Sequence, residues 1–184
     1  MEDSGRDTED LELGSIRIFD DALTEDFCTS LIESFKINLD RQETKDKFVQ
    51  FNYSEVYEEE ETHKELTDFI FTLREHYLKQ INLPPNMFET SGVEKLRIRK
   101  YLNNEKNVLI NVDVRDKKSS IRALGFIFFL NDSERKVEFF RQNLGITGKA
   151  GRVIVYPPTW EYPYRVSDKA EDDTYCLQSY IHYG

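Results

Sequence analysis

The segment spanning residues 107–119, NVLINVDVRDKKS, has the spacing of half a metal site but lacks one of the usual ligands. Asn111 and Asp113 are separated by Val112, so on a β-strand their side chains would share one face while Val112 points to the other. A histidine at position 111 would make this a pair of metal ligands, but this chain has asparagine there. Three interpretations are open: a catalytic site with unusual ligands, a site that has lost its chemistry, or an ordinary strand.

The composition predicts a single globular domain. The chain has 184 residues, of which 39% are hydrophobic and 13% aromatic, enough to bury one core. Its formal net charge of -10 argues against a nucleic-acid binder, because such proteins need clustered Lys and Arg. No apolar run approaches the length of a membrane span. We therefore expect neither nucleic acid nor membrane among the partners.

The acidic N-terminal residues and the two cysteines suggest the bounds of the domain and the compartment of the protein. Residues 1–14 are acidic and predict a flexible arm, which leaves 15–184 as the single domain. The acidic opening MEDSGRDTED does not resemble a secretory leader. Two cysteines, Cys28 and Cys176, are too few for a disulfide scaffold. We expect an intracellular, cytoplasmic protein.

Two amphipathic helices and at least six strands would have to position these residues. Thr24, followed by two acidic residues, is a typical N-cap for a helix over 24–39. The segment 63–81 predicts a second helix, because apolar residues recur there at helical spacing: Leu66, Phe69, Ile70, Leu73 and Tyr77. Strand patterns follow at 94–102, 107–113, 121–130, 136–140, 152–156 and 174–183. Helices followed by strands, with no helix between strands, favour an α+β fold with an antiparallel sandwich or barrel.

The order of these segments resembles the 2-oxoglutarate- and Fe(II)-dependent oxygenases, of the prolyl 4-hydroxylase-like branch. The resemblance extends from about Ile16 to Tyr183 and rests on the segments IRIFDDALTEDFCTSLIESF, EKLRIRKYLNNEKNVLINVDV, IRALGFIFFLND, KVEFF, GRVIVYPPTWEYPYRV and DDTYCLQSYIHY. It implies a double-stranded β-helix core (jelly-roll, cupin-like) with the N-terminal helices packed on one sheet.

The resemblance also assigns the positions of the family's site. Members hold Fe(II) with a His-x-Asp pair and a distal His, and they bind the far carboxylate of 2-oxoglutarate with Arg or Lys. Here Asn111 occupies the first His position, Asp113 the carboxylate position and Tyr164 the distal His position. Thr174 occupies the position of the 2-oxoglutarate anchor, and Tyr101 matches a tyrosine that contacts this co-substrate in relatives.

Of the three metal-ligand positions and the anchor position, only that of Asp113 keeps the residue type that the family uses. The three histidines are His63, His76 and His182, so no alignment of residues 77 to 181 restores the missing ligands. We interpret the chain as a degenerate oxygenase-fold protein, a pseudoenzyme acting as a binding or regulatory module. On this interpretation we expect no cofactor, and the partner is an unknown small molecule or protein.

Two alternatives remain open. The first is an active 2-oxoglutarate-dependent hydroxylase that uses Fe(II) with variant ligands, or another metal that prefers oxygen ligands. The second is a cavity that binds a small organic acid without turnover, in which Arg165 or Lys169 serves as a displaced anion clamp.

Overall fold

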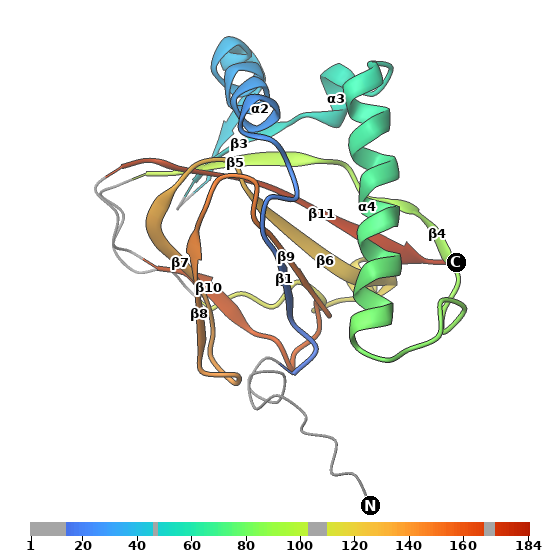
Figure 1. Ribbon diagram of the computed structural model, residues 1–184. Helices are drawn as coiled ribbons and strands as arrows, with labels where there is room; N and C mark the ends of the chain where they lie inside the picture. The colour runs from blue at the N-terminus through green and yellow to red at the C-terminus, as the bar shows by residue number, and fades with distance from the viewer. Residues whose placement is uncertain (1–13, 46–47, 103–109, 168–171) are drawn as a thin grey trace, which may run out of the picture.

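The structure is a computed structural model that describes residues 14–45, 48–102, 110–167 and 172–184 (Figure 1). Its helices are α2 (Glu25–Ile37), α3 (Ser54–Tyr57) and α4 (Glu61–Gln80), with short 3-10 turns at Leu39–Arg41 and Ser119–Ile121. The strands are β1 (Arg17–Phe19), β2 (Gln42–Thr44), β3 (Phe48–Asn52), β4 (Thr90–Val93), β5 (Arg97–Tyr101), β6 (Arg122–Phe129), β7 (Ser133–Phe139), β8 (Leu144–Gly148), β9 (Val153–Tyr156), β10 (Tyr164–Val166) and β11 (Thr174–Tyr183).

The strands form two antiparallel sheets. The larger sheet has the order β1-β9-β6-β11-β5-β3-β2, with β4 also paired to β11, and the smaller sheet has the order β10-β7-β8. Figure 1 shows α2 and α4 outside the larger sheet and the smaller sheet on its other side. The larger sheet is therefore covered on both faces, which explains why β6 is apolar along nearly its whole length.

The helices form where the sequence signals predict them. The Thr24 hydroxyl accepts a hydrogen bond from the Phe27 amide at 3.2 Å and so caps α2. Along α4 the predicted stripe faces the sheet, and Leu66, Ile70 and Tyr77 are buried. These side chains lie in a core cluster between the helices and the larger sheet.

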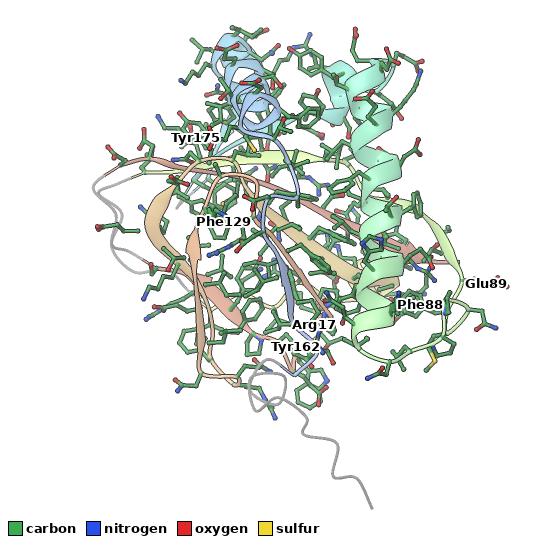
Figure 2. The ribbon with its side chains drawn as sticks, in the orientation of Figure 1. Arg17, Phe88, Glu89, Phe129, Tyr162 and Tyr175 are labelled. Atoms are coloured by element: carbon green, nitrogen blue, oxygen red, sulfur yellow. The ribbon has the colours of Figure 1, made fainter. Side chains whose placement is uncertain are left out.

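A second core cluster fills the space between the two sheets. It includes Phe129, labelled in Figure 2, with Phe139, Tyr156 and Tyr164. Tyr156 on β9 lies opposite Gly125 on β6, and a Cβ at Gly125 would lie only 2.7 Å from the Tyr156 Cζ. The absence of a side chain at Gly125 thus lets the tyrosine ring lie flat across the neighbouring strand.

The structure corrects two sequence expectations about the elements. Strands β2 and β3 lie between α2 and α3, so the chain does not simply run from helices to strands. Residues 107–109 of the expected strand 107–113 lie outside the described residues, and Asn111 forms only an isolated bridge with Tyr164. No helix in the described ranges is long and apolar enough to cross a membrane.

Candidate functional site

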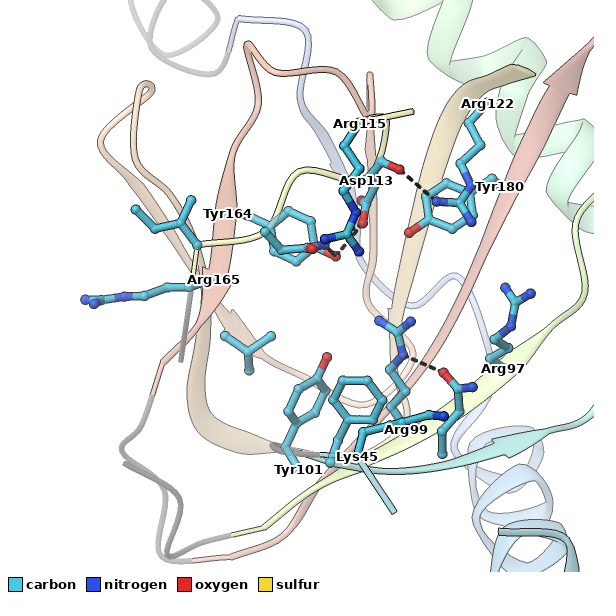
Figure 3. Close-up of a pocket in the computed structure, with 15 residues that line it drawn as sticks. Lys45, Arg97, Arg99, Tyr101, Asp113, Arg115, Arg122, Tyr164, Arg165 and Tyr180 are labelled. Carbon is cyan, nitrogen blue, oxygen red and sulfur yellow. Dashed lines mark hydrogen bonds between the residues drawn. The ribbon is translucent and has the colours of Figure 1, made fainter. Parts of the chain in front are cut away.

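A cavity of about 510 Å³ opens between the two sheets (Figure 3). Its walls come from β3, β5, β10 and β11, and from the segment that contains Asn111 and Asp113. Among its lining residues are Tyr101, Asn111, Asp113, Tyr164, Arg165 and Tyr180. The cavity thus brings together five of the seven residues that the sequence singled out; Thr174 lies outside its lining, and Lys169 lies outside the described residues.

The backbone holds positions 111 and 164 opposite each other. The Asn111 amide donates to the Tyr164 carbonyl at 2.7 Å, and the Tyr164 amide donates back to the Asn111 carbonyl at 3.0 Å. The Asn111 side chain also reaches Asp113, with its Nδ2 2.6 Å from Oδ1. The three residues that the resemblance assigns to metal-ligand positions therefore lie side by side.

Hydrogen-bond donors surround the buried carboxylate of Asp113. Oδ1 accepts from Asn111 Nδ2 at 2.6 Å and from the Tyr164 hydroxyl at 3.3 Å, while Oδ2 accepts from the Tyr156 hydroxyl at 2.6 Å. The Arg122 guanidinium donates to the backbone carbonyl of the same residue at 2.8 Å. Three side-chain donors thus satisfy a carboxylate that would otherwise be costly to bury.

The phenols of this cluster stay protonated. Burial, reinforced by the nearby charge of Asp113, raises the pKa of Tyr164 and that of Tyr156 well above the ordinary value near 10. Gln178 donates to the same two hydroxyls, because its Nε2 lies 2.9 Å from the Tyr164 oxygen and 3.4 Å from the Tyr156 oxygen. The tyrosines therefore act as donors to Asp113 and not as anionic ligands.

These residues do not fit ferrous iron. Asn111 turns its N–H₂ group, and not its amide oxygen, toward Asp113. An amide nitrogen has no free lone pair to give a metal. Tyr164 would have to lose a proton that burial retains. No group of three or more His, Cys, Asp or Glu able to hold a metal occurs within the described ranges. We therefore assign no step of a reaction to iron in this cavity.

The position of the co-substrate anchor is part of the core. The Thr174 side chain is fully buried, and its hydroxyl shares a hydrogen bond of 2.6 Å with Ser133 Oγ. Arg135 on β7 donates to it from Nε at 3.3 Å and to the Ser167 carbonyl from Nη1 at 2.6 Å. A cation thus lies beside the anchor position, but it comes from another strand and binds protein acceptors.

Of the two suggested anion clamps, the structure describes only Arg165. Arg165 lines the cavity, but its Nε lies 2.5 Å from Glu138 Oε2, and Figure 3 shows its side chain pointing away from the other labelled residues. Lys169 lies outside the described residues. Neither placement tests the clamp, which stays a prediction.

Sequence reasoning missed Arg99, one of the cations that line the cavity. Its guanidinium donates to the Oε1 atoms of Gln50, at 3.2 Å, and of Gln178. Burial lowers the pKa of this arginine, but the nearby tyrosines and Asp113 raise it more, so the group stays charged. The signal was present in RIRKY, where strand alternation places Arg99 on the same face as Tyr101.

Two of the three histidines have structural partners. His63 Nε2 lies 2.9 Å from Ser54 Oγ, and His182 Nε2 lies 3.1 Å from Glu94 Oε2. Glu94 also pairs with Arg97 and Arg122 at the end of three neighbouring strands. Both histidines are thus engaged away from Asp113.

Comparison with known proteins identifies the fold. No family model and no curated protein sequence matches this chain. A collagen prolyl hydroxylase of Paramecium bursaria Chlorella virus-1, in complex with 2-oxoglutarate, superposes with a TM-score of 0.66 at 16% identity over 91% of this chain and 95% of the other. A Pseudomonas putida prolyl 4-hydroxylase gives 0.67 at 14% identity over 95% of both chains. This chain has the prolyl 4-hydroxylase fold.

A third match extends this result to a hydroxylase solved with a peptide. The prolyl hydroxylase of Trichoplax adhaerens, bound to a fragment of the hypoxia inducible factor oxygen degradation domain, has a TM-score of 0.69 at 10% identity over 95% of this chain and 86% of the other. The predicted α+β double-stranded β-helix with N-terminal helices on one sheet is therefore confirmed. At sequence identities this low, the structural similarity shows the fold alone and not the activity.

Proposed function

We propose that this oxygenase-fold chain does not run the iron and 2-oxoglutarate reaction and instead acts as a binding or regulatory module through its cavity. One observation carries the proposal: the Asp113 carboxylate already accepts hydrogen bonds from Asn111, Tyr156 and Tyr164. The side chains that would have to bind iron bind one another.

The energetic reason is the replacement of ligands by donors. An imidazole offers a neutral lone pair to a metal, whereas the inward-facing amide nitrogen and protonated phenol offer hydrogens. A cation entering the cluster would have to displace at least two short hydrogen bonds to a buried carboxylate, and each charged hydrogen bond contributes about 1.5–3 kcal/mol. Its positive charge would also add to that of the neighbouring Arg99.

The direct test combines metal binding with turnover. The purified chain would be incubated with Fe(II), ascorbate and 2-oxoglutarate, and succinate would be measured with and without candidate proline-containing peptides. We expect no succinate above the level without protein. Turnover abolished by Asp113→Ala would overturn the proposal and favour the active hydroxylase with variant ligands.

A designed variant tests whether the ligand positions are assigned correctly. Because the backbone bridge fixes positions 111 and 164 opposite each other, Asn111→His combined with Tyr164→His places two imidazoles beside Asp113. We expect this double variant to bind Co(II) at least tenfold more tightly than wild type, read from the visible spectrum of the bound ion. Asn111→His alone is the matched control, and equal binding by all three proteins would show that the positions are misassigned.

Location and partners are part of the same proposal. Both cysteines are free and buried, which is compatible with an intracellular, reducing setting. We place the protein in the cytoplasm, where it would bind a small molecule in the cavity or a protein partner. Fractionation of cells that express the tagged chain tests the location, and recovery in the secreted fraction would contradict it.

A further inference from the structure

We infer that the acidic segment 1–13 docks on an exposed surface of its own chain, formed by Phe140, Arg141 and Trp160 together with the basic segment 115–118. We call this surface the Trp160 patch. It lies where β7 ends and on the loop between β9 and β10. The inference is independent of the proposed function, because of these residues only Arg115 lines the cavity.

The Trp160 patch exposes two large aromatic side chains. Trp160, the single tryptophan of the chain, is 65% exposed, and Phe140 is 40% exposed. The segments that carry them are bonded to each other. The Phe140 amide donates to the Pro163 carbonyl at 3.2 Å, and Gln142 Nε2 donates to the Glu161 carbonyl at 3.1 Å. Apolar surface gathered in this way on a soluble domain is typical of an interaction site.

Cationic side chains surround these aromatic rings. The guanidinium carbon of Arg141 lies 5.3 Å from the centroid of the Trp160 ring, a cation–π contact that leaves the charge of the arginine uncompensated. The Val114 amide donates to the Pro158 carbonyl at 2.9 Å. This hydrogen bond holds the start of the segment 115–118, RDKK, against the loop that carries the tryptophan.

The patch is basic although the chain as a whole is acidic. Within residues 14–45, 48–102, 110–167 and 172–184, no carboxylate lies within ion-pair distance of its four cations, which are Arg115, Lys117, Lys118 and Arg141. Counted with the acidic residues of the same segments, Asp116 and Glu161, the patch has a formal charge of +2. Its chemistry therefore fits an acidic segment with some apolar side chains.

The segment 1–13 has this chemistry. It contains six carboxylates and one arginine, a formal charge of -5, which is half of the -10 of the whole chain. Its last five residues are EDLEL. In an extended chain, Asp10 and Glu12 point to one side, and Leu11 and Leu13 point to the other. The leucines can therefore cover the Trp160 ring while the carboxylates face the cations around it.

The described chain begins at the edge of the patch. The Ser15 amide donates to the Tyr162 hydroxyl at 3.3 Å, and Arg17 Nη1 donates to the Gly14 carbonyl at 2.8 Å. Figure 2 shows Arg17 and Tyr162 at the same end of the molecule. Trp160 is two residues from Tyr162, at most about 7 Å along the chain. A segment tethered this close has an effective concentration on the order of millimolar, so weak contacts are enough for docking.

The first experiment is cross-linking of the full chain with a carbodiimide, which joins a carboxylate directly to a lysine amine. Mass spectrometry would locate the linked residues. We expect the carboxylates of 1–13 to be linked to the lysines of 115–118 at least fivefold more often than to Lys79. Lys79 is the matched control, because the end of α4 lies at the same exit, where the Tyr77 hydroxyl donates to the Ser15 carbonyl at 2.8 Å. An undocked segment would reach both sides.

The second experiment measures the quenching of Trp160 fluorescence by acrylamide. Because the chain has one tryptophan, the signal reports on this patch alone, and a neutral quencher is insensitive to its charge. We expect the quenching constant to rise at least twofold, at low salt, in a variant that removes three carboxylates of the segment: Glu9→Gln, Asp10→Asn and Glu12→Gln. High NaCl should raise the constant of the wild type to the same level, because salt screens contacts between exposed charges.

A control variant removes the same number of charges from exposed positions between α3 and α4: Glu58→Gln, Glu59→Gln and Glu60→Gln. It should be quenched like the wild type. Equal cross-linking to Lys79 and to the lysines of 115–118 would overturn the inference, as would quenching that the first variant leaves unchanged. Cross-links that join two chains, with a yield that falls on dilution, would also overturn it, because the segment would then bind a second copy. The cross-linking result comes from the unmodified chain, so it decides even if a variant fails to fold.

Discussion

The hydroxyl of Tyr156 is the most informative single group in the cluster around Asp113. Within the described residues it is the one side-chain donor to Oδ2, at 2.6 Å, whereas Oδ1 accepts from both Asn111 and Tyr164. Replacing Tyr156 with Phe keeps the ring in place against Phe139, whose centroid is 5.3 Å away, and removes only the donor. The buried carboxylate would then have one oxygen unpaired.

The expected cost follows from that geometry. A short hydrogen bond to a buried charge contributes about 2 kcal/mol to the free energy of unfolding. For a chain of this size this corresponds to a fall in melting temperature of about 4–8 °C. Tyr164→Phe removes a longer bond of 3.3 Å to an oxygen that keeps a second donor, so its cost should be about 1 kcal/mol or less.

The assay is urea unfolding followed by circular dichroism, for both tyrosine variants and for each combined with Asp113→Asn. A double-mutant cycle gives the coupling between each hydroxyl and the carboxylate. We expect a coupling of about 1–2 kcal/mol for Tyr156 and less for Tyr164. Equal costs for the two tyrosines, or a coupling near zero for Tyr156, would refute the view that protein donors satisfy Asp113.

Three further predictions address other parts of the molecule. Gly125→Ala should lower the free energy of unfolding by about 2–3 kcal/mol, because its Cβ would lie 2.7 Å from the fully buried Tyr156 ring; a cost below about 0.5 kcal/mol would contradict this close approach. Burial raises the pKa of Glu94, but guanidinium and imidazole donors lower it more, to about 2, from an ordinary 4.5. The contribution of its carboxylate to the free energy of unfolding, about 3 kcal/mol, is therefore complete above pH 4.5 and lost as the pH falls toward 2. Glu94→Gln should remove this loss from the acid side of the curve of unfolding free energy against pH. An acid side unchanged from wild type would contradict the prediction. Burial raises the pKa of the Cys28 thiol and raises that of Cys176 to about 12, so neither should react with Ellman's reagent at pH 8 until denaturant is added, and a fast reacting thiol in the native protein would show that the surrounding core opens.

The sequence predicted the regular elements best where one periodic pattern was long. The strand expected over 174–183 has those bounds in the structure, and α4 covers the expected 63–81 within two residues. Strands β2 and β3 were missed, because three and five residues of mixed polarity carry little local signal and become strands by pairing with each other and with β5.

The candidate site was predictable in position but not in chemistry. The resemblance brought Asn111, Asp113 and Tyr164 together, whereas Arg99 was missed although strand alternation places it on the same face as Tyr101. The pairing of donors with Asp113 depends on side-chain rotamers and on Tyr156 crossing Gly125 from a neighbouring strand. Such contacts between distant segments leave no periodic pattern in the sequence. That protein donors satisfy both oxygens of Asp113 could therefore be recognised only from the structure.

The unequal covering of the two sheets has a dynamic consequence for ligand exchange. The three-stranded sheet alternates buried and exposed residues and, in the described part of the chain, lacks helices on its outer side, whereas the wall that carries Arg99 and Gln178 lies beneath α2 and α4. Amide protons of β7, β8 and β10 should therefore exchange with solvent sooner than those of β6 and β11. Transient loosening of the three-stranded sheet would widen the cavity, while Arg99 and Gln178 stay fixed on the larger sheet.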